Sequence, residues 1–292
     1  MELSYRNCCL CPRNCGADRT AGQRGYCGCP DTALVASYMR HFWEEPVLAG
    51  EGGSGAVFFG GCTLGCRYCQ NREISGGPVG TPTDSRGLRE IFEKLIAEGA
   101  ENIDLVTPTH FLPTILPALT PKLPVPVVYN CGGYEKPEIL RALDGLVDVY
   151  LPDFKYADSA LAASLSGAGD YFERSCESLR EMVRQTGPAV MKDGKLLRGV
   201  LVRHLILPGQ IENSLKVLDW LGENFRPGEI LVSLMRQYTP VGGLPAPMDR
   251  KITEEEYQAV LSWMYLNELE GFTQEADSAD ITYIPDFGTG KQ

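Results

Sequence analysis

Short apolar runs alternate along the chain with segments in which apolar side chains recur every three to four positions. The runs predict buried strands, and the periodic segments predict helices that pack one face against a sheet. The expected strands are 56–59, 103–107, 125–129, 147–151, 199–206 and 230–234. The expected helices are 85–98, 137–146, 173–186, 212–223 and a last one that opens with the capping box Thr253-x-x-Glu256 and stops at Gly271.

This order of elements predicts an α/β fold, because strand–helix–strand units are nearly always parallel and right-handed. We expect a partial, six-stranded parallel β/α barrel over residues 49–271, a Cys-rich N-terminal cap over 1–48 and a C-terminal extension over 272–292 that could form a strand and a lid. Ligands of such folds bind at the carboxyl ends of the strands. The residues that follow each strand are therefore the candidates for function.

Composition and charge narrow the class of protein. The net charge of −11 argues against nucleic acid as a partner, because phosphate binding needs a basic face. No run of eighteen apolar residues and no apolar leader at Met1 is present, so we expect neither a membrane partner nor secretion. The eleven cysteines of a cytoplasmic chain indicate metal or redox chemistry, and an oxygen-labile centre suits an anaerobic host.

Three of these cysteines directly follow the first expected strand. Cys62, Cys66 and Cys69 have the spacing Cys-x3-Cys-x2-Cys after Gly60 and Gly61. Three thiolates do not close a tetrahedral zinc site, but they fill three corners of a four-iron, four-sulfur cube and leave one iron open to a ligand. The alternative is a zinc loop with a distant fourth ligand.

This motif, with the aromatic Tyr68 before its last cysteine, resembles the radical S-adenosylmethionine (SAM) superfamily. The resemblance implies that the open iron of a 4Fe-4S cluster binds the amino and carboxylate groups of SAM. It also implies that one electron cleaves SAM to methionine and a 5'-deoxyadenosyl radical, which abstracts a hydrogen atom. An electron donor such as flavodoxin or ferredoxin would be a partner.

A second group of cysteines lies near the N-terminus. Cys8, Cys11, Cys15 and Cys27 have the crowding of a second metal site, with Cys9 and Cys29 as spare ligands. Three interpretations stay open at this point: a structural zinc or single-iron site, an auxiliary iron–sulfur cluster, and free thiols.

The segment Cys8-x2-Cys11-Pro-Arg-x-Cys15-Gly, followed by His41-x-Trp43-Glu-Glu-Pro46, sharpens the resemblance. It is similar to a branch of radical SAM proteins related to pyruvate formate-lyase activating enzymes. That relation implies hydrogen abstraction from a backbone glycine of a partner glycyl-radical enzyme. The alternative is modification of another peptide or of a small metabolite.

The resemblance also assigns residues at the strand ends. Asp153 and Lys155 match the Asp-x-Lys of the activating enzymes, and Arg203 matches an Arg of their fifth strand. Asn130 stands where those enzymes have Asp. These residues are expected to bind SAM polar groups or substrate, with Tyr68 near the adenine; a structural ion pair is the alternative for Asp153 and Lys155.

The Gly-Gly-Glu that binds the SAM amino group in activating enzymes is absent. Thr107-Pro-Thr-His110 occupies its place after the second strand, so Thr107 and His110 are candidate acceptors for the amino group. The alternative is a turn whose histidine is only hydrogen-bonded.

Overall fold

A single sheet organises the chain. The computed structural model describes residues 3–274 and 287, and within them the sheet has ten strands in the order β10-β9-β8-β6-β5-β4-β2-β1-β3, with β7 paired to β8. The strands are β1 (Ala33–His41), β2 (Ser54–Phe59), β3 (Thr81–Thr83), β4 (Ile103–Val106), β5 (Val127–Cys131), β6 (Val149–Pro152), β7 (Val190–Lys192), β8 (Lys195–Leu205), β9 (Leu231–Met235) and β10 (Gly271–Thr273).

The six strands expected from the sequence form the parallel part of this sheet. β2, β4, β5, β6, β8 and β9 pair in that order, all parallel. β10 adds a parallel edge strand next to β9, whereas β1 and β3 pair antiparallel at the other edge. Because β3 and β10 end the order without pairing to each other, the barrel is partial, as predicted.

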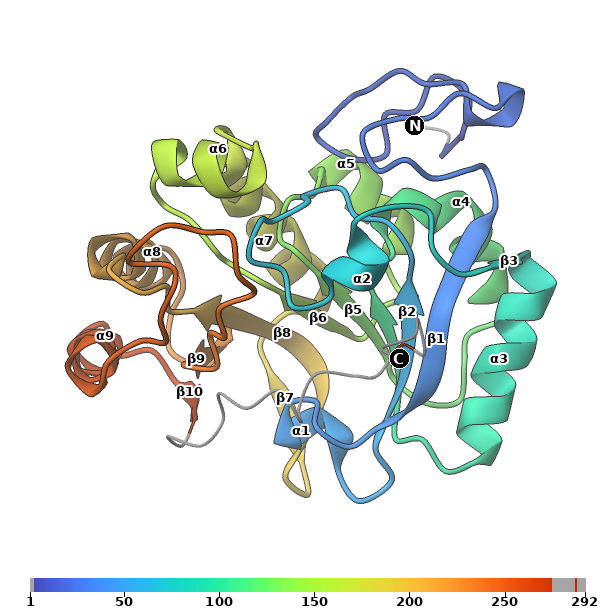
Figure 1. Cartoon of the computed structure of the whole chain (residues 1–292). Helices are drawn as coiled ribbons and strands as arrows, with labels where there is room; N and C mark the ends of the chain where they lie inside the picture. Colours follow the sequence, from blue (N-terminus) through green and yellow to red (C-terminus); the bar gives the residue numbers. More distant parts are fainter. Residues whose placement is uncertain (1–2, 275–286, 288–292) are drawn as a thin grey trace.

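Helices cover the outer face of the sheet (Figure 1). Local signals start several of them: Asp84 accepts a hydrogen bond from the Gly87 amide, and Thr253 and Glu256 form the predicted capping box. The helices are α1 (Pro46–Ala49), α2 (Arg72–Ser75), α3 (Ser85–Ala97), α4 (Leu112–Ala118), α5 (Pro137–Leu140), α6 (Ser159–Ser166), α7 (Tyr171–Thr186), α8 (Ile211–Asn224) and α9 (Glu254–Leu266), with 3₁₀ turns η1 (Arg19–Ala21), η2 (Thr109–Phe111) and η3 (Arg141–Leu143).

The inner face of the sheet is filled at one end by α1. Val47 and Leu48 of α1 pack against Val128, Leu151 and Leu201, which point inward from β5, β6 and β8. Figure 1 shows α1 at the opposite end of the sheet from the N-terminal segment. Since side chains alternate along a strand, residues two positions further along share this inner face and lie closer to the carboxyl ends of the strands.

The structure differs from the expected elements in places. β1 lies within the expected cap, 1–48, yet it pairs with β2, so the sheet begins before residue 49. The expected helix 137–146 is shorter, ending as α5 and η3. Of the C-terminal extension, β10 and Phe287 are described, and the Phe287 ring packs 5.3 Å from the Phe58 ring; the rest of the expected lid lies outside the described residues.

Candidate active site

Two glycines lead from β2 into the loop that carries the three cysteines. A Cβ atom at Gly60 would lie 1.8 Å from the Val79 carbonyl oxygen, and one at Gly61 would lie 2.3 Å from the Cys29 sulfur. Gly61 also has a φ of +76°, which glycine adopts without strain. The chain can therefore turn here only because both positions lack side chains.

Each of the three cysteine sulfurs accepts a hydrogen bond. The Leu64 amide donates to Cys62 at 3.3 Å, the Ser166 hydroxyl to Cys66 at 3.0 Å and the Ser75 hydroxyl to Cys69 at 3.5 Å. Such donors stabilise negative charge on sulfur, as thiolates and the sulfurs of iron–sulfur clusters require. The loop therefore offers three ligands whose surroundings suit a cluster.

Burial affects the protonation of these thiols. It raises the pKa of Cys62 to about 12, with a further contribution from the neighbouring Cys66. Burial also raises the pKa of Cys66, although the nearby Lys155 ammonium opposes that rise. Because metal ligation removes thiol protons, cluster assembly would release protons from this loop.

Over residues 3–274 and 287, no group of three or more His, Cys, Asp or Glu side chains lies close enough together to hold one metal ion. The ligands of a four-iron cluster bind separate corners of the cube and stand further apart than ligands of one ion. A 4Fe-4S cluster held by Cys62, Cys66 and Cys69 stays a prediction.

Tyr68 lies inside a cluster of tyrosines. Its hydroxyl accepts from the Tyr156 hydroxyl at 2.8 Å, and its ring packs against the rings of Tyr156 and Tyr238 at centroid distances of 6.5 and 6.1 Å. The side chain is almost fully buried. It therefore anchors the cysteine loop to the outer layer of the protein, and its contact with adenine stays a prediction.

Four of the predicted strand-end residues meet on the inner face. Arg203 donates through Nε to Asp153 Oδ1 at 3.0 Å and through Nη2 to Asn130 Oδ1 at 2.6 Å, and Lys155 donates to Asp153 Oδ2. His204 points to the outer layer, where it bonds the Phe154 carbonyl. Arg203 therefore faces the interior of the barrel, and His204 does not.

These charges stabilise one another. Burial would raise the pKa of Asp153, but Lys155 and Arg203 outweigh it and hold that pKa below its usual value. Burial would lower the pKa values of Lys155 and Arg203, but the carboxylates around them raise both. All three side chains are therefore charged at neutral pH, and they join β6 to β8 at the carboxyl ends.

The residues after β4 do not join this group. Thr107 has a φ of +59° and turns the chain away, and its amide bonds the Asn130 carbonyl. The His110 ring is buried, its Nε2 is 2.8 Å from the Gly60 carbonyl oxygen, and burial lowers its pKa to about 4. His110 thus supports the start of the cysteine loop and does not lie beside Asn130, so its role as an acceptor for the SAM amino group gains no support from the geometry.

The N-terminal segment holds the cysteine loop through two arginines. Arg13 lies between the rings of Tyr26 and Tyr134 and donates to the carbonyl oxygens of Thr63 and Leu64 in the loop. It also donates to the carbonyls of Ser166 and Gly167 at the end of α6. The buried Arg19 donates to the His110 carbonyl at 2.6 Å. The segment therefore fixes the loop against α6 and η2.

The N-terminal cysteines differ in their exposure to solvent. Cys8 and Cys11 are buried, Cys15 is exposed and Cys27 is half-buried. Cys29, considered only as a spare ligand, is fully buried and donates to the Cys27 and Gly60 carbonyls. A second metal site formed by Cys8, Cys11, Cys15 and Cys27 stays a prediction.

Three acidic residues that were not among the predicted site residues also reach the inner face. Glu44 and Glu45 come from the turn between β1 and α1, and Asp104 lies within β4. Glu44 contacts both Arg203 and Asn130, at 3.4 and 3.3 Å. A sequence signal was present, since Asp104 interrupts an apolar strand and an acidic pair precedes Pro46, but neither position follows a parallel strand.

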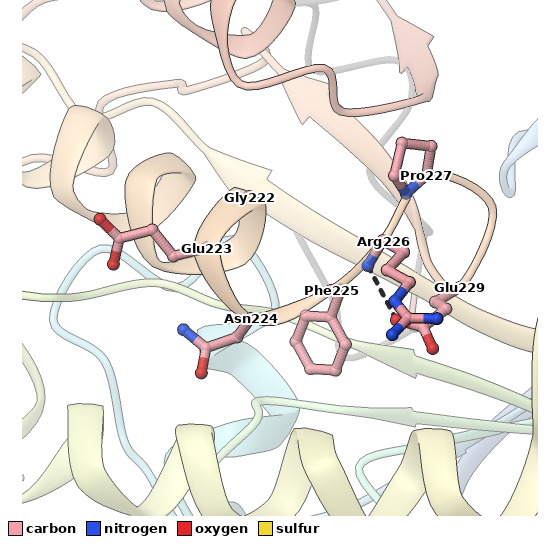
Figure 2. Close-up of a pocket in the computed structure, with 7 residues that line it drawn as sticks. All are labelled: Gly222, Glu223, Asn224, Phe225, Arg226, Pro227 and Glu229. Carbon is pink, nitrogen blue, oxygen red and sulfur yellow. Dashed lines mark hydrogen bonds between the residues drawn. The ribbon is translucent and has the colours of Figure 1, made fainter.

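One hollow lies away from all these residues. It is lined by the end of α8 and the turn before β9, where the Arg226 amide donates to Glu229 at 2.8 Å (Figure 2). This turn precedes a parallel strand, so the hollow lies at the amino end of β9. Ligands of this fold bind at the other end.

Comparison with known proteins agrees with this geometry. Residues 48–110 match the family described as a 4Fe-4S single cluster domain, which includes the cysteine loop. An uncharacterized protein of Methanocaldococcus jannaschii is 28% identical over 270 residues, covering 88% of this chain and 74% of that protein.

Solved structures share the fold at low identity. SuiB of Streptococcus suis, bound to its precursor peptide SuiA, superposes with a TM-score of 0.52 at 14% identity, over 75% of this chain and 47% of SuiB. This chain therefore spans about half the length of SuiB. A radical SAM methyltransferase of Sphaerobacter thermophilus gives 0.52 at 13% identity, over 79% of this chain and 69% of that enzyme. The matched 4Fe-4S region contains the cysteine loop, and the solved structures share the fold of this chain.

Proposed function

We propose that Cys62, Cys66 and Cys69 hold a 4Fe-4S cluster with one open iron and that SAM binds beside it across the carboxyl ends of the strands. The observation that carries this proposal is the hydrogen-bonded set of three cysteines next to the Asp153–Lys155–Arg203 group. When bound, the cluster and SAM supply an electron and a 5'-deoxyadenosyl radical able to abstract hydrogen from an otherwise unreactive position.

The protein's own residues bind, orient and shield. Lys155 lies near enough to Cys66 for their charges to interact, so it links the cluster loop to the strand-end group. Arg203 and Asn130 offer donors and acceptors for the carboxylate, amino or ribose groups of SAM. Gly65 and Arg67 at the tip of the loop are exposed, which suits approach by an electron donor such as flavodoxin or ferredoxin.

The finer proposal is that the hydrogen comes from a backbone glycine of a partner glycyl-radical enzyme, in an anaerobic cytoplasm. The open edges of the sheet at β3 and β10 suit a peptide loop, which a closed barrel would exclude. The adjacent Asp153 and Lys155 can accept from a peptide N–H and donate to a peptide carbonyl. SuiB, which has the same fold, was solved with a peptide bound.

A second candidate is modification of another peptide or of a small metabolite that bears positive charge. The observation in its favour is that Glu44, Glu45 and Asp104 all place carboxyl groups on the inner face. Binding an uncharged glycine backbone would not require these groups. None of the described helices is long and apolar enough to cross a membrane.

Anaerobic reconstitution followed by an assay for 5'-deoxyadenosine tests the shared chemistry. Wild-type protein with SAM and dithionite should form 5'-deoxyadenosine, and Cys66→Ala should form none. Cys176→Ala, which removes a buried thiol on α7 rather than in the loop, is the matched control and should remain active. Turnover by Cys66→Ala would contradict the proposal.

Electron paramagnetic resonance separates the two substrate classes. The active protein is incubated with SAM, reductant and each glycyl-radical enzyme of the host. A glycyl doublet supports the activating function. Its absence with every partner, while SAM is still cleaved, would favour the second candidate.

A further inference from the structure

Two neighbouring glutamates extend into the barrel from the turn that precedes α1. Glu44 contacts Arg203 Nη1 at 3.4 Å and Asn130 Nδ2 at 3.3 Å, and its side chain is only 10% exposed. Glu45 is 9% exposed and lies beside Ser233 on β9. These two buried acidic side chains are not needed to start a helix of four residues. Because they point into the barrel, they require a polar or charged group there as a partner.

A third carboxyl group lies deeper on the same face. Asp104 is fully buried, and its Oδ2 accepts from Asn130 Nδ2 at 3.3 Å. It stands opposite Val128, two residues nearer the start of β5 than Asn130. Among the described residues, its other oxygen, Oδ1, has no hydrogen-bond partner, and the buried Ser233 hydroxyl beside Glu45 makes no hydrogen bond of ordinary geometry. A buried polar atom without a partner is destabilising, so both atoms are suited to a ligand.

The positive charges nearby are already engaged. Lys155 bonds Asp153, and Arg203 bonds Asp153, Asn130 and Glu44. In the described part of the chain, two cationic side chains thus face the carboxyl groups of Asp153, Glu44, Glu45 and Asp104. Both cations bond Asp153. Glu45 and Asp104 receive no hydrogen bond from either cation among the described contacts. Burial and the nearby Glu44 raise the pKa of both carboxyl groups, to about 7 for Glu45.

We propose that Glu44, Glu45 and Asp104 bind a cationic group of the substrate, an ammonium or a guanidinium, inside the barrel. This inference rests on the proposed function, because it names the substrate class of that site. An amine or guanidine on a side chain, a peptide N-terminus or a small metabolite would supply the group. Ser233 and Asp104 Oδ1 would accept its hydrogen bonds, and the carboxylates would balance its charge.

The spacing favours an organic cation over a metal ion. In the described part of the chain, no three acidic, histidine or cysteine side chains surround a point where one ion would sit. An ammonium or guanidinium group presents several N–H donors that point in different directions, so it can reach acceptors that are spread over β4, β9 and the turn before α1.

The SAM ammonium is a less suitable occupant. The predicted SAM contacts Asn130, Asp153 and Arg203 form the layer nearest the cysteine loop, and Asp104 lies beneath that layer. A substrate group held beneath SAM would place the rest of the substrate between the acidic residues and the cluster. That position suits hydrogen abstraction by a radical formed at the strand ends.

Binding of small probes to the reconstituted full chain tests this. Ligand-observed NMR measures the affinities of n-butylammonium and n-butylguanidinium, with 1-butanol as the neutral probe, in the presence of saturating SAM. We expect at least one cation to bind about tenfold or more tightly than 1-butanol, as for a charge-assisted hydrogen bond. Glu45→Gln and Asp104→Asn should each remove most of this preference, whereas Glu98→Gln on the exposed end of α3 should leave it unchanged.

Several results would overturn the inference. The first is that 1-butanol binds as tightly as the two cations. The second is that both variants keep the wild-type preference for the cations. The third is that Na⁺, K⁺ or Mg²⁺ displaces the cations at concentrations too low to act by screening charge. Exclusion of the probes by SAM, with weaker SAM binding in Glu45→Gln, would assign the acids to SAM instead. Circular dichroism shows that each variant is folded. All these measurements report binding, so they stand whether or not SAM is cleaved, and loss of cleavage alone would count only against the proposed function.

Discussion

Arg13 Nε lies 2.9 Å from the carbonyl oxygen of Thr63, so the N-terminal segment directly contacts the loop of the three cysteines. The same guanidinium reaches the end of α6, where Ser166 donates to Cys66. One side chain therefore fixes the loop relative to a residue that supports one of its sulfurs. The N-terminal segment is therefore part of the proposed cluster site, although Arg13 and Ser166 are 153 residues apart in the sequence.

The first prediction concerns this clamp. Arg13→Lys keeps the charge but cannot make the same set of hydrogen bonds, because Lys lacks the planar fork of donors. We expect the reconstituted variant to lose iron several-fold faster to a chelator than wild-type protein does, with Arg24→Lys in the exposed turn as a matched control. Equal rates of iron loss in Arg13→Lys and wild type would show that the clamp does not hold the cluster.

The second prediction concerns the two serine donors. The Ser166 hydroxyl is 3.0 Å from Cys66 Sγ, whereas the Ser75 hydroxyl is 3.5 Å from Cys69 Sγ. Hydrogen bonds to sulfur stabilise the reduced cluster, so removing one lowers the reduction potential. We expect Ser166→Ala to lower the potential more than Ser75→Ala in a redox titration followed by electron paramagnetic resonance. The reverse order would contradict the geometry.

The third prediction concerns SAM binding. Asp153 joins Lys155 and Arg203 in the strand-end group, whereas Glu135 lies in the outer layer and bonds Thr109 and Tyr129. Asp153→Asn should therefore raise the SAM dissociation constant by about tenfold or more, as expected for the loss of a charged hydrogen-bond partner. Glu135→Gln should change it less. Equilibrium binding of SAM to the reconstituted variants measures both, and a larger effect at Glu135 would place the SAM site on a different loop.

The fourth prediction concerns the N-terminal cysteines. If Cys8, Cys11, Cys15 and Cys27 bind metal independently, a variant with Ala at all three cysteines of the loop should still contain zinc or iron. Elemental analysis after anaerobic purification measures this. A metal-free protein would identify the N-terminal cysteines as ordinary thiols, and the segment would then act through Arg13 and Arg19.

Much of the fold could be predicted because its signals are local. The apolar runs, the helix periodicity and the capping box at Thr253 each lie within a few residues. The strands and most helices that they predict appear in the structure, although the helix expected over 137–146 is shorter and the last helix ends at Leu266, before Gly271. α4 and α6 were missed because their sequences lack a polar face: α4 contains Pro113 and Pro117, and α6 is mostly Ala, Ser and Leu.

The site was predictable only where a motif marks it. Asn130, Asp153, Lys155 and Arg203 follow or end parallel strands, and the topology brings them together. Glu44 lies more than eighty residues before Asn130 and enters from the opposite end of the barrel, so no spacing in the sequence links the two. That contact depends on α1 filling the inner face, which only the packing reveals.

The last prediction concerns the dependence of stability on pH. Burial and the neighbouring Glu44 and Asp153 raise the pKa of Glu45 from 4.5 to about 7, against the opposing effect of Arg203. Between these two values the folded protein keeps a proton that the unfolded chain releases. Stability contributed by this group is therefore present below pH 4.5 and is lost as the pH rises through about 7.

Glu45→Gln lacks this titration, so its free energy of unfolding relative to wild type should rise between pH 5 and pH 8. The gain is at most about 3 kcal/mol, because each unit of pKa difference corresponds to about 1.4 kcal/mol. Urea unfolding at both pH values, with Glu98→Gln as the exposed control, measures the difference. A substrate analogue with a cationic group should reverse the order by stabilising the wild type alone at pH 8. The opposite result would be a Glu45→Gln variant that is less stable than the wild type at pH 8 without any ligand. Glu45 would then be a structural acid whose charge Arg203 already balances, and it would not bind a cationic substrate group.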